Sequence, residues 1–241
     1  MNKFAVFDID GTLFRSGLYR ELVFELDRVG AIPKSVRQAY EDKKQAWHDR
    51  THGNAFREFE QAMVDALNAI IPSIDVQAYD AAAKLIVKAQ KNNVYFYTRT
   101  MVQKLKERGY YLIAISGSQI ELIEQFAPFY GFDHWVGQEY ERNNGVFTGS
   151  IFETHTNKDR LLKKLIEEKD LTLADSYGFG DSSGDISMLE LVENPIAFNP
   201  DKPLAKHAQT SGWDIVVERK NNTYSLRNDG DGYVLADVIY N

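Results

Sequence analysis

The stretch FAVFDIDGTL, from Phe4 to Leu13, joins an apolar run to two aspartates one residue apart and then to Gly-Thr. A continuous apolar run, rather than an alternating one, is typical of a strand that is covered on both faces, as in a parallel sheet. Asp8 and Asp10 therefore stand at the carboxyl end of a predicted buried strand. Ligands of open α/β sheets bind at that end, so the pair marks a candidate site.

Along an extended backbone, residues i and i+2 point to the same side. Two carboxylates placed there repel each other and lose hydration, so we expect either one proton on the pair or a shared cation. The alternative, on this stretch alone, is a pair of solvated turn aspartates next to Gly11 and Thr12.

The rest of the chain predicts an α/β fold, because apolar runs at 110–115, 176–179 and 195–198 are separated by segments of helical periodicity. Residues 16–95 differ, since they contain helical patterns and no strand pattern. Four helices are predicted there, at roughly 18–29, 34–50, 54–70 and 76–92. We therefore expect an α/β core of residues 1–15 and 96–241, interrupted by a helical domain at 16–95.

Two hairpins are expected in the second half of the chain. One turns at Asn143-Asn144-Gly145, a strong hairpin signal. The other lies in the C-terminal stretch, where NDGDG resembles part of a calcium loop but lacks that loop's remaining acids and its final glutamate, so a turn is favoured. The side chains expected to pack on an edge of the core are Tyr224, Leu226, Tyr233 and Leu235.

Composition excludes several classes of site. The 241 residues include no cysteine, which rules out disulfides, thiolate metal sites and cysteine nucleophiles. A formal net charge of -7 argues against non-specific nucleic-acid binding. No stretch approaches the roughly 20 apolar residues of a membrane span, so neither a membrane nor a nucleic acid is an expected partner and the location predicted is cytoplasmic. The sequence does not indicate the oligomeric state.

Three further stretches carry polar groups to the ends of predicted strands or helices. GFGDSSGDISML supplies Asp181 and Asp185, AISGSQ supplies Ser116 and Gly117, and NKDRLLKKL opens with Lys158. Carboxylates suit Mg²⁺, and a hydroxyl with backbone N–H groups suits an anion. The alternatives are structural: Ser116 as a helix N-cap, Lys158 as a surface charge and Asp185 as an acid in a first helical turn.

Together these stretches resemble the four motifs of the haloacid dehalogenase superfamily of phosphohydrolases, in order DIDGT, SGS, Lys158 and GDSSGD. The resemblance covers about 1–15 and 96–220, and it implies a three-layer Rossmann-like sheet. The helical block at 16–95 lies where one branch of the superfamily inserts a cap, and the hairpin near Asn144 is similar to that of the phosphoserine-phosphatase-like branch.

The resemblance implies a role for each acid. Asp8 would be the nucleophile that forms an aspartyl-phosphate. Asp10 would be the general acid and base. Mg²⁺ would be held by the Asp8 carboxylate, the Asp10 backbone carbonyl and Asp181. Asp185 would support this set, either by orienting Lys158 or through metal-bound water.

The phosphoryl oxygens would be held by Ser116, the Gly117 amide and Lys158. The expected activity is Mg²⁺-dependent hydrolysis of a small soluble phosphorylated metabolite. The alternatives are a phosphotransferase or mutase of the same superfamily, and a sensor that binds a phosphometabolite without turnover. An acid at position 10 argues against dehalogenation, because superfamily dehalogenases lack one there.

Phosphoserine is not the expected substrate. Phosphoserine phosphatases carry a glutamate seven residues after the second aspartate of the first motif, and this chain has Gly17 at that position. They also carry an arginine in a cap helix that aligns with FEQAMVDALNAI, and this stretch contains no arginine. Other cap groups that could contact a leaving group are left without a role: Arg20, Lys43, Lys44, Trp47, His48, Arg50 and Arg57.

Overall fold

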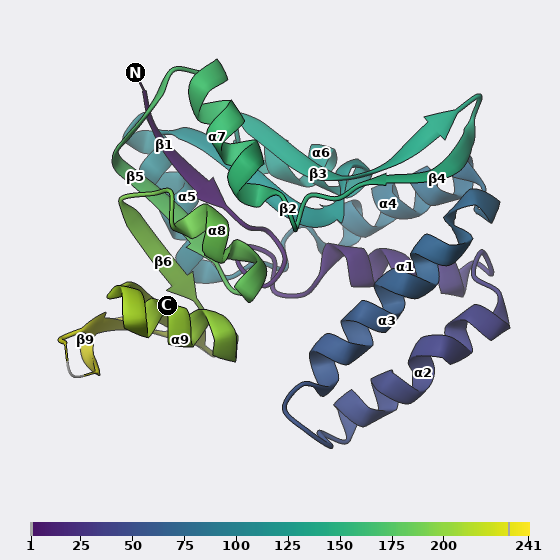
Figure 1. Cartoon of the computed structure of the whole chain (residues 1–241), viewed down its shortest axis with the longest axis horizontal. Helices are drawn as coiled ribbons and strands as arrows, with labels where there is room; N and C mark the ends of the chain where they lie inside the picture. The colour runs from purple at the N-terminus through teal and green to yellow at the C-terminus, as the bar shows by residue number, and fades with distance from the viewer. Residues whose placement is uncertain (1, 231) are drawn as a thin grey trace.

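A computed structural model describes residues 2–230 and 232–241, and its centre is one nine-stranded sheet in the order β4-β3-β2-β1-β5-β6-β7-β8-β9 (Figure 1). The strands are β1 (Asn2–Phe7), β2 (Tyr111–Gln119), β3 (His134–Asn143), β4 (Val146–Phe152), β5 (Leu171–Gly180), β6 (Asn194–Phe198), β7 (Asp214–Arg219), β8 (Asn222–Asn228) and β9 (Tyr233–Tyr240). The helices are α1 (Leu18–Arg28), α2 (Lys34–His48), α3 (Ala55–Ile70), α4 (Val76–Gln90), α5 (Phe96–Glu107), α6 (Ile120–Phe129), α7 (Lys158–Glu168), α8 (Ile186–Leu189) and α9 (Lys202–Ser211), with short 3₁₀ turns η1 (Ile71–Ser73) and η2 (Ser183–Asp185).

In the spatial order of the sheet, the six neighbouring strands β3-β2-β1-β5-β6-β7 pair in parallel. β4 at one edge and β8 and β9 at the other add antiparallel pairs. The predicted α/β fold with a parallel sheet is confirmed, and the antiparallel edges are an addition to it. The chain passes from β1 to β2 on one side and later reaches β5 on the other. The carboxyl ends of β1 and β5 therefore form a topological switch point, where ligands of such sheets bind.

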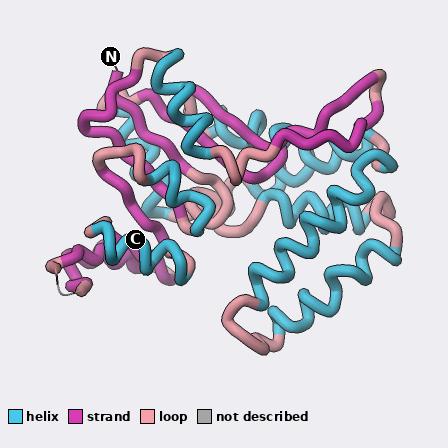
Figure 2. The backbone as a smooth tube through the Cα atoms, viewed as in Figure 1, coloured by secondary structure: helices cyan, strands magenta, loops and turns pink. Residues whose placement is uncertain are grey.

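The apolar run of β1 is buried on both faces, as its pattern predicts. Phe7 faces a cluster that includes α5 and α6, and Val6 faces a second cluster that includes α7, α8 and α9. Helices consequently cover both faces of the sheet, and the layers are visible in Figure 2. Phe7 also stacks on Phe179 of β5 with ring centroids 4.3 Å apart, which helps to hold the two site-bearing strands in register.

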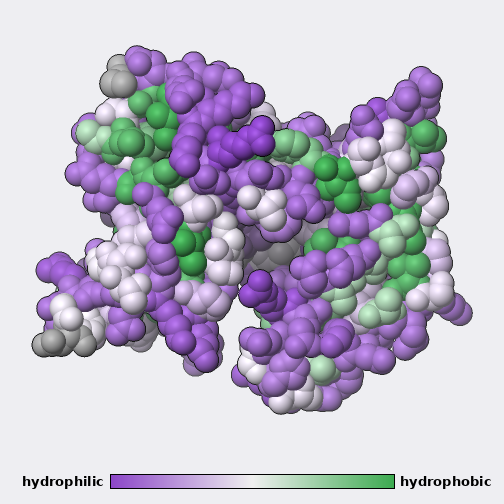
Figure 3. Space-filling model, viewed as in Figure 1, coloured by the Kyte–Doolittle hydropathy of each residue, from purple (hydrophilic) through white to green (hydrophobic). Residues whose placement is uncertain are grey.

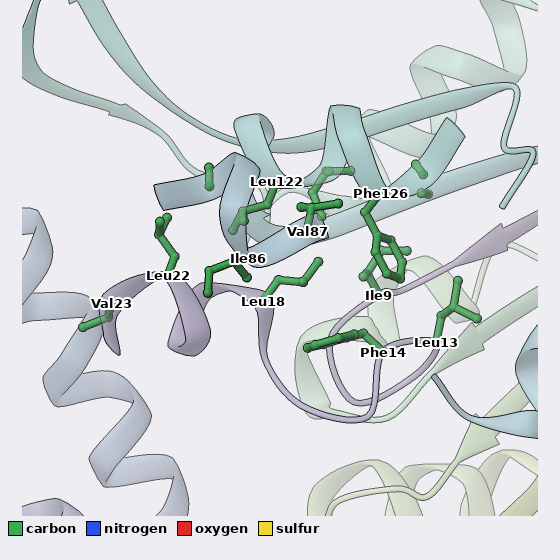
Figure 4. Close-up of a cluster of buried hydrophobic side chains, with 14 of the residues drawn as sticks. Ile9, Leu13, Phe14, Leu18, Leu22, Val23, Ile86, Val87, Leu122 and Phe126 are labelled. Carbon is green, nitrogen blue, oxygen red and sulfur yellow. The ribbon is translucent and has the colours of Figure 1, made fainter. Parts of the chain in front are cut away.

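The four helices predicted at 16–95 are present as α1 to α4, and each begins and ends within two residues of its expected position. Their packing is uneven. α2 and α3 form an arm that projects from the molecule (Figure 1), whereas α1 and α4 pack on the core. Figure 4 shows their buried side chains meeting those of α6: Leu18, Leu22, Ile86, Val87, Leu122 and Phe126. The division of the chain into a core and a cap stays a prediction.

Both expected hairpins are confirmed. Asn144 and Gly145 connect β3 to β4 with φ of 49° and 78°, the backbone that a tight two-residue hairpin turn needs. β8 pairs with β9, and Leu226 and Tyr233 pack on the second cluster. Leu235, in contrast, is 57% exposed. Its predicted packing is wrong because β9 is the last strand of the sheet.

Within residues 2–230 and 232–241, every helix is too short or too polar to cross a bilayer.

Candidate active site

The first and last predicted motifs meet at the carboxyl ends of β1 and β5. These strands are parallel neighbours, with Phe7 beside Phe179, so the residues that follow them are brought together. One carboxylate oxygen from each of Asp8, Asp181 and Asp185 lies within 4.8 Å of the others. Backbone geometry allows this approach, because a Cβ at Gly11 would lie 2.1 Å from an oxygen of Asp181 and Gly11 has a φ of +83°.

Lys158 reaches into this cluster from the start of α7. Its Nζ donates to Asp8 Oδ1 and to Asp185 Oδ1, each at 2.6 Å, and its side chain is only 4% exposed. Burial alone would lower the pKa of Lys158, but the charges of Asp185 and Asp8 and their hydrogen bonds raise it above its ordinary value. The lysine is therefore a buried cation, and its interpretation as a surface charge is wrong.

Each carboxylate oxygen of Asp185 has its own hydrogen-bond partners. Its Oδ2 accepts hydrogen bonds from the amides of Asp181 and Ser182 and from the Ser182 hydroxyl, which is the capping arrangement of η2. Its Oδ1 accepts from Lys158. The residue thus serves as a first-turn acid and also fixes the lysine and the turn that carries Asp181.

Two acids of this cluster, Asp8 and Asp181, resist ionisation. Burial raises the pKa of Asp8 to about 7, because Lys158 offsets the loss of hydration only in part and Asp185 and Asp10 add repulsion. Burial and the neighbouring charge of Asp8 raise the pKa of Asp181 well above its ordinary value. Asp8 Oδ2 is also buried without a hydrogen-bond partner. An oxygen-only donor set with an unpaired carboxylate oxygen fits a hard divalent cation such as Mg²⁺.

Asp10 is held separately from the three-acid cluster. Its Oδ2 accepts from the hydroxyls of Ser118 at 2.6 Å and Ser116 at 3.1 Å, and its Oδ1 accepts from the Leu18 amide at 2.6 Å. Burial raises the pKa of Asp10, and these three hydrogen bonds lower it in part. Asp8 is hydrogen-bonded to Lys158, whereas Asp10 is hydrogen-bonded to neutral donors. Such a difference in environment is the usual basis for different roles of two acids.

The second motif lies in the last part of β2, which leads directly into α6. β2 continues to Gln119, which is the N-cap position of α6, so the interpretation of Ser116 as an N-cap is wrong. Ser118 was not among the predicted site residues. The spacing could have indicated it, because Ser116 and Ser118 are two apart on a strand and so face the same side.

Two adjoining cavities meet at this site. The first, of about 380 Å³, is lined by Asp8, Asp10, Lys158 and Asp181. The second, of about 350 Å³, shares Asp10 and Gly117 with the first and continues along one side of α3. The surface is indented between the sheet region and the α2–α3 arm (Figure 3). Of the predicted site residues, Ser116 and Asp185 line neither cavity. The others line a space that can hold a small ligand: Asp8, Asp10, Gly117, Lys158 and Asp181.

Of the seven cap candidates named from the sequence, two line the cavities. Arg20 lines both cavities, and its guanidinium is paired with Glu60 at 2.9 Å and bonded to Ser16 at 2.6 Å. Arg57 lines the second cavity. The remaining cap candidates line neither cavity, and they are Lys43, Lys44, Trp47, His48 and Arg50.

Trp47 instead stacks on Phe59 with centroids 5.3 Å apart and packs against the first hydrophobic cluster. Other lining residues were missed by sequence reasoning, among them Ser16, Glu60 and His155. No local pattern identifies these residues, since their place depends on how the insertion folds back on the core.

A family model for haloacid dehalogenase-like hydrolases matches residues 5–190. The chain belongs to this family. The relatives of this family member include a protein named histidinol-phosphatase from Neisseria meningitidis, 25% identical over 90% of this chain and 99% of the relative. A protein named phosphoserine phosphatase from Methanocaldococcus jannaschii is 22% identical over 91% of this chain and 93% of the relative.

Solved structures agree on the fold. A protein of unknown function from Bordetella pertussis superposes with a TM-score of 0.70 at 20% identity, covering 89% of this chain and 98% of that one. A phospho-aspartyl intermediate analogue of phosphoserine phosphatase superposes with a TM-score of 0.61 at 20% identity, covering 91% and 94%. The arrangement of a sheet with a helical insertion is therefore one that this family uses.

Proposed function

We propose that this hydrolase is a Mg²⁺-dependent phosphomonoesterase that acts on a small phosphorylated metabolite through an aspartyl-phosphate. The observation that carries the proposal is the state of Asp8, whose Oδ1 is held by Lys158 while its buried Oδ2 has no partner. A carboxylate with one fixed and one free oxygen at a cavity wall is oriented for attack on a bound phosphoryl group.

In the first step, Asp8 Oδ2 forms a bond to phosphorus as the ester bond to the leaving oxygen breaks. Asp10 donates its proton to that oxygen, a role that its raised pKa favours because the acid must hold a proton near neutral pH. In the second step, Asp10 takes a proton from water, the water oxygen bonds to phosphorus, and Asp8 leaves as a carboxylate. Inorganic phosphate and the alcohol are the products.

The metal would be held by the carboxylates of Asp8 and Asp181 and the backbone carbonyl of Asp10, with Asp185 behind them. When bound, Mg²⁺ would supply positive charge that offsets repulsion between the nucleophile and the phosphate. The raised pKa values of Asp8 and Asp181 are consistent with this, since both acids lack a cation other than Lys158 in the part of the chain described.

The phosphoryl oxygens would be held by the Ser116 hydroxyl, the Gly117 amide and Lys158. Gly117 lines both cavities, and Lys158 lines the first one. The Ser116 hydroxyl donates to Asp10 in the free protein, so it would have to turn toward the phosphate. Donors fixed around the transferring group stabilise the charge that develops in the transition state.

For the leaving group, we extend the proposal to an alcohol that carries a protonated amine and no carboxylate. The second cavity is lined by Asp65 and Glu153, and neither carboxylate forms an ion pair with any residue in 2–230 and 232–241. Two arginines line this cavity as well: Arg20 is already paired with Glu60, and Arg57 is outnumbered by the two acids without an ion pair. An excess of acids on the cavity wall favours a cation. Relatives named for both histidinol phosphate and phosphoserine are consistent with an amine-bearing substrate.

The test is phosphate release from a panel of phosphomonoesters: histidinol phosphate, phosphoethanolamine, phosphoserine and phosphoglycolate. Each is measured with Mg²⁺ and with EDTA, and the protein is compared with Asp8→Asn. We expect metal-dependent turnover that disappears in the variant and ranks the two amines without a carboxylate first. Release that persists in Asp8→Asn would refute the mechanism. Binding without release would indicate a sensor, and release only with an added alcohol acceptor would indicate a phosphotransferase.

A further inference from the structure

The last strand, β9, is an open and apolar edge of the sheet. Its only strand neighbour is β8, and its burial is low along its whole length. Four of the twelve exposed large hydrophobic residues in the described part of the chain lie within its eight residues: Val234, Leu235, Ile239 and Tyr240. A strand of this kind presents unpaired backbone donors and acceptors together with apolar side chains, and such an edge can pair with another strand.

The sequence of β9, YVLADVIY, is nearly symmetric in residue type, with tyrosine at both ends, two aliphatic residues next to each tyrosine, and Ala236 and Asp237 at the centre. If two copies pair antiparallel about the centre of the strand, each aromatic or aliphatic residue faces another. The opposed residues are Tyr233 with Tyr240, Val234 with Ile239, Leu235 with Val238, and Ala236 with Asp237. Cross-strand pairs of aromatic and β-branched residues are the ones that stabilise antiparallel sheets.

A bulge in β9 makes this register possible. Directly paired residues of an antiparallel ladder point to the same face. Leu235 pairs with Leu226 and Asp237 with Ser225, which are neighbours on β8, so Ala236 is an extra residue and the alternation of faces reverses there. Leu235 therefore shares a face with Val238, as the symmetric register requires.

The backbone alternates in the same way. The Asn241 amide bonds to the Asn221 carbonyl on the β8 side, so the amides of Tyr240 and Val238 point outward. The Val238 amide donates to the Asp237 carboxylate and not to β8, which agrees with this direction. The bulge then turns Leu235 and Tyr233 outward in the first half of the strand. The four residues whose backbone amides point outward are therefore opposed in pairs in the symmetric register, Tyr233 to Tyr240 and Leu235 to Val238.

The other edge of the sheet lacks these properties. β4 contains Gly149 at a φ of +92°, a backbone conformation that interrupts a regular strand. It also packs beside η1, where Pro72 lies 3.2 Å from the place that a Cβ at Gly149 would take. The contrast identifies β9 as the edge that is suited to pairing.

We propose that two copies of this chain associate about a two-fold axis through antiparallel pairing of β9, which joins their sheets into one. The contact is one pair of eight-residue strands, so it falls at the low end of interface sizes and we expect a reversible dimer with a dissociation constant on the order of micromolar. No residue of β9 lines either active-site cavity. The proposal therefore does not depend on the proposed function.

The first test is sedimentation velocity of the full chain over a range of concentrations. We expect a shift from monomer to dimer, and Leu235→Lys should abolish it by placing two lysines in apolar cross-strand positions. Leu85→Lys is the matched control, since Leu85 is 45% exposed on α4, and it should leave the dimer intact. Phosphate release, if present, should be equal in all three proteins, and circular dichroism should show that both variants are folded.

The second test uses Asp237, which the bulge places on the same face in both copies, next to the two-fold axis. Two carboxylates repel there, so an equimolar mixture of the protein with an affinity-tagged Asp237→Lys form should contain mixed dimer well above the one-half share that random association gives, as counted by native mass spectrometry. A statistical mixture would refute the register. A monomer at every concentration would refute the dimer and show that Asp237 and the bulge protect the edge from pairing.

Discussion

Lys158→Met removes the cation of the buried acid cluster and keeps most of the side-chain volume. In the protein, Lys158 Nζ is 2.6 Å from both Asp8 and Asp185, whose side chains are 6% and 0% exposed. In the variant, the carboxylates of Asp8, Asp185 and Asp181 remain close together without the positive charge of Lys158. We expect a large loss of stability in the absence of metal, and no turnover.

The size of the loss follows from the burial. Removing one partner of a buried ion pair costs about 3–5 kcal/mol, because the remaining charge is left unpaired in a region of low polarity. For a chain of this size, 1 kcal/mol corresponds to roughly 2–4 °C in Tm, so the expected decrease in Tm is roughly 6–20 °C. The range applies where the acids are ionised.

The loss should grow with pH. Burial raises the pKa of Asp8 from 3.8 to about 7, so the folded state binds more protons than the unfolded chain between these values. Stability from this group is therefore fully present below the unfolded pKa and is lost as pH rises through about 7. Without Lys158, which lowers the pKa of Asp8 in the protein, the acid stays protonated to a higher pH. The variant should thus be least affected in acid and most affected above pH 7.

The assay is thermal and urea unfolding of both proteins in EDTA at about pH 5.5, 7 and 8.5. Lys163→Met is the control on the same helix, since Lys163 is 56% exposed in an i,i+4 pair with Asp159, and its effect should stay within about 0.5 kcal/mol. A Lys158→Met variant no less stable than this control, or a penalty that shrinks as pH rises, would refute the account of the cluster.

Three other changes separate the roles of the site residues. Asp10→Asn should lower kcat by roughly 10²–10⁴-fold for alkyl phosphates. With p-nitrophenyl phosphate, which needs no acid, it should instead give a burst of product as phosphorylated Asp8 accumulates, and the lack of a burst would count against Asp10 as the base. Ser118→Ala removes a hydrogen bond that lowers the pKa of Asp10, so the pH–rate profile should move to higher pH, whereas an unchanged profile would show that this bond does not tune the acid. Gly11→Ala, with its Cβ 2.1 Å from an oxygen of Asp181, should weaken Mg²⁺ binding by calorimetry and cost about 1–3 kcal/mol of stability, and wild-type affinity would contradict the close approach.

The residues that sequence reasoning could place are those attached to strand ends. Asp8, Asp181 and Ser116 follow or end apolar runs, and parallel strands bring their carboxyl ends to one edge, so local pattern and sheet geometry were enough to predict that they meet. Lys158 required only one more element, the helix that it opens. Local signals also predicted the hairpin turn at Asn144, because the backbone there permits few residue types.

Residues whose position depends on contacts across the insertion could not be predicted. Glu60 enters the site because it pairs with Arg20 on α1 from its place on α3, and no spacing in the sequence expresses that contact. His155 lies on a loop that reaches the same cavities from the other side. Leu235 shows the opposite error, since it lies in an apolar stretch that is typical of a covered strand, and only the strand order reveals that nothing in the described chain covers it.

The continuous packing of α1 and α4 on α6 limits how this protein could acquire a new substrate by recombination. A transplant of the whole stretch between β1 and α5 would cut through one hydrophobic cluster and expose both halves. The α2–α3 arm, in contrast, packs mainly on itself and carries the cavity-lining side of α3. Residues 34–70 are thus the smaller unit of exchange between relatives, and a chimera joined at Pro33 and Ile71 should fold if it keeps apolar residues at Tyr40, Phe59, Met63 and Leu67, which belong to the same cluster.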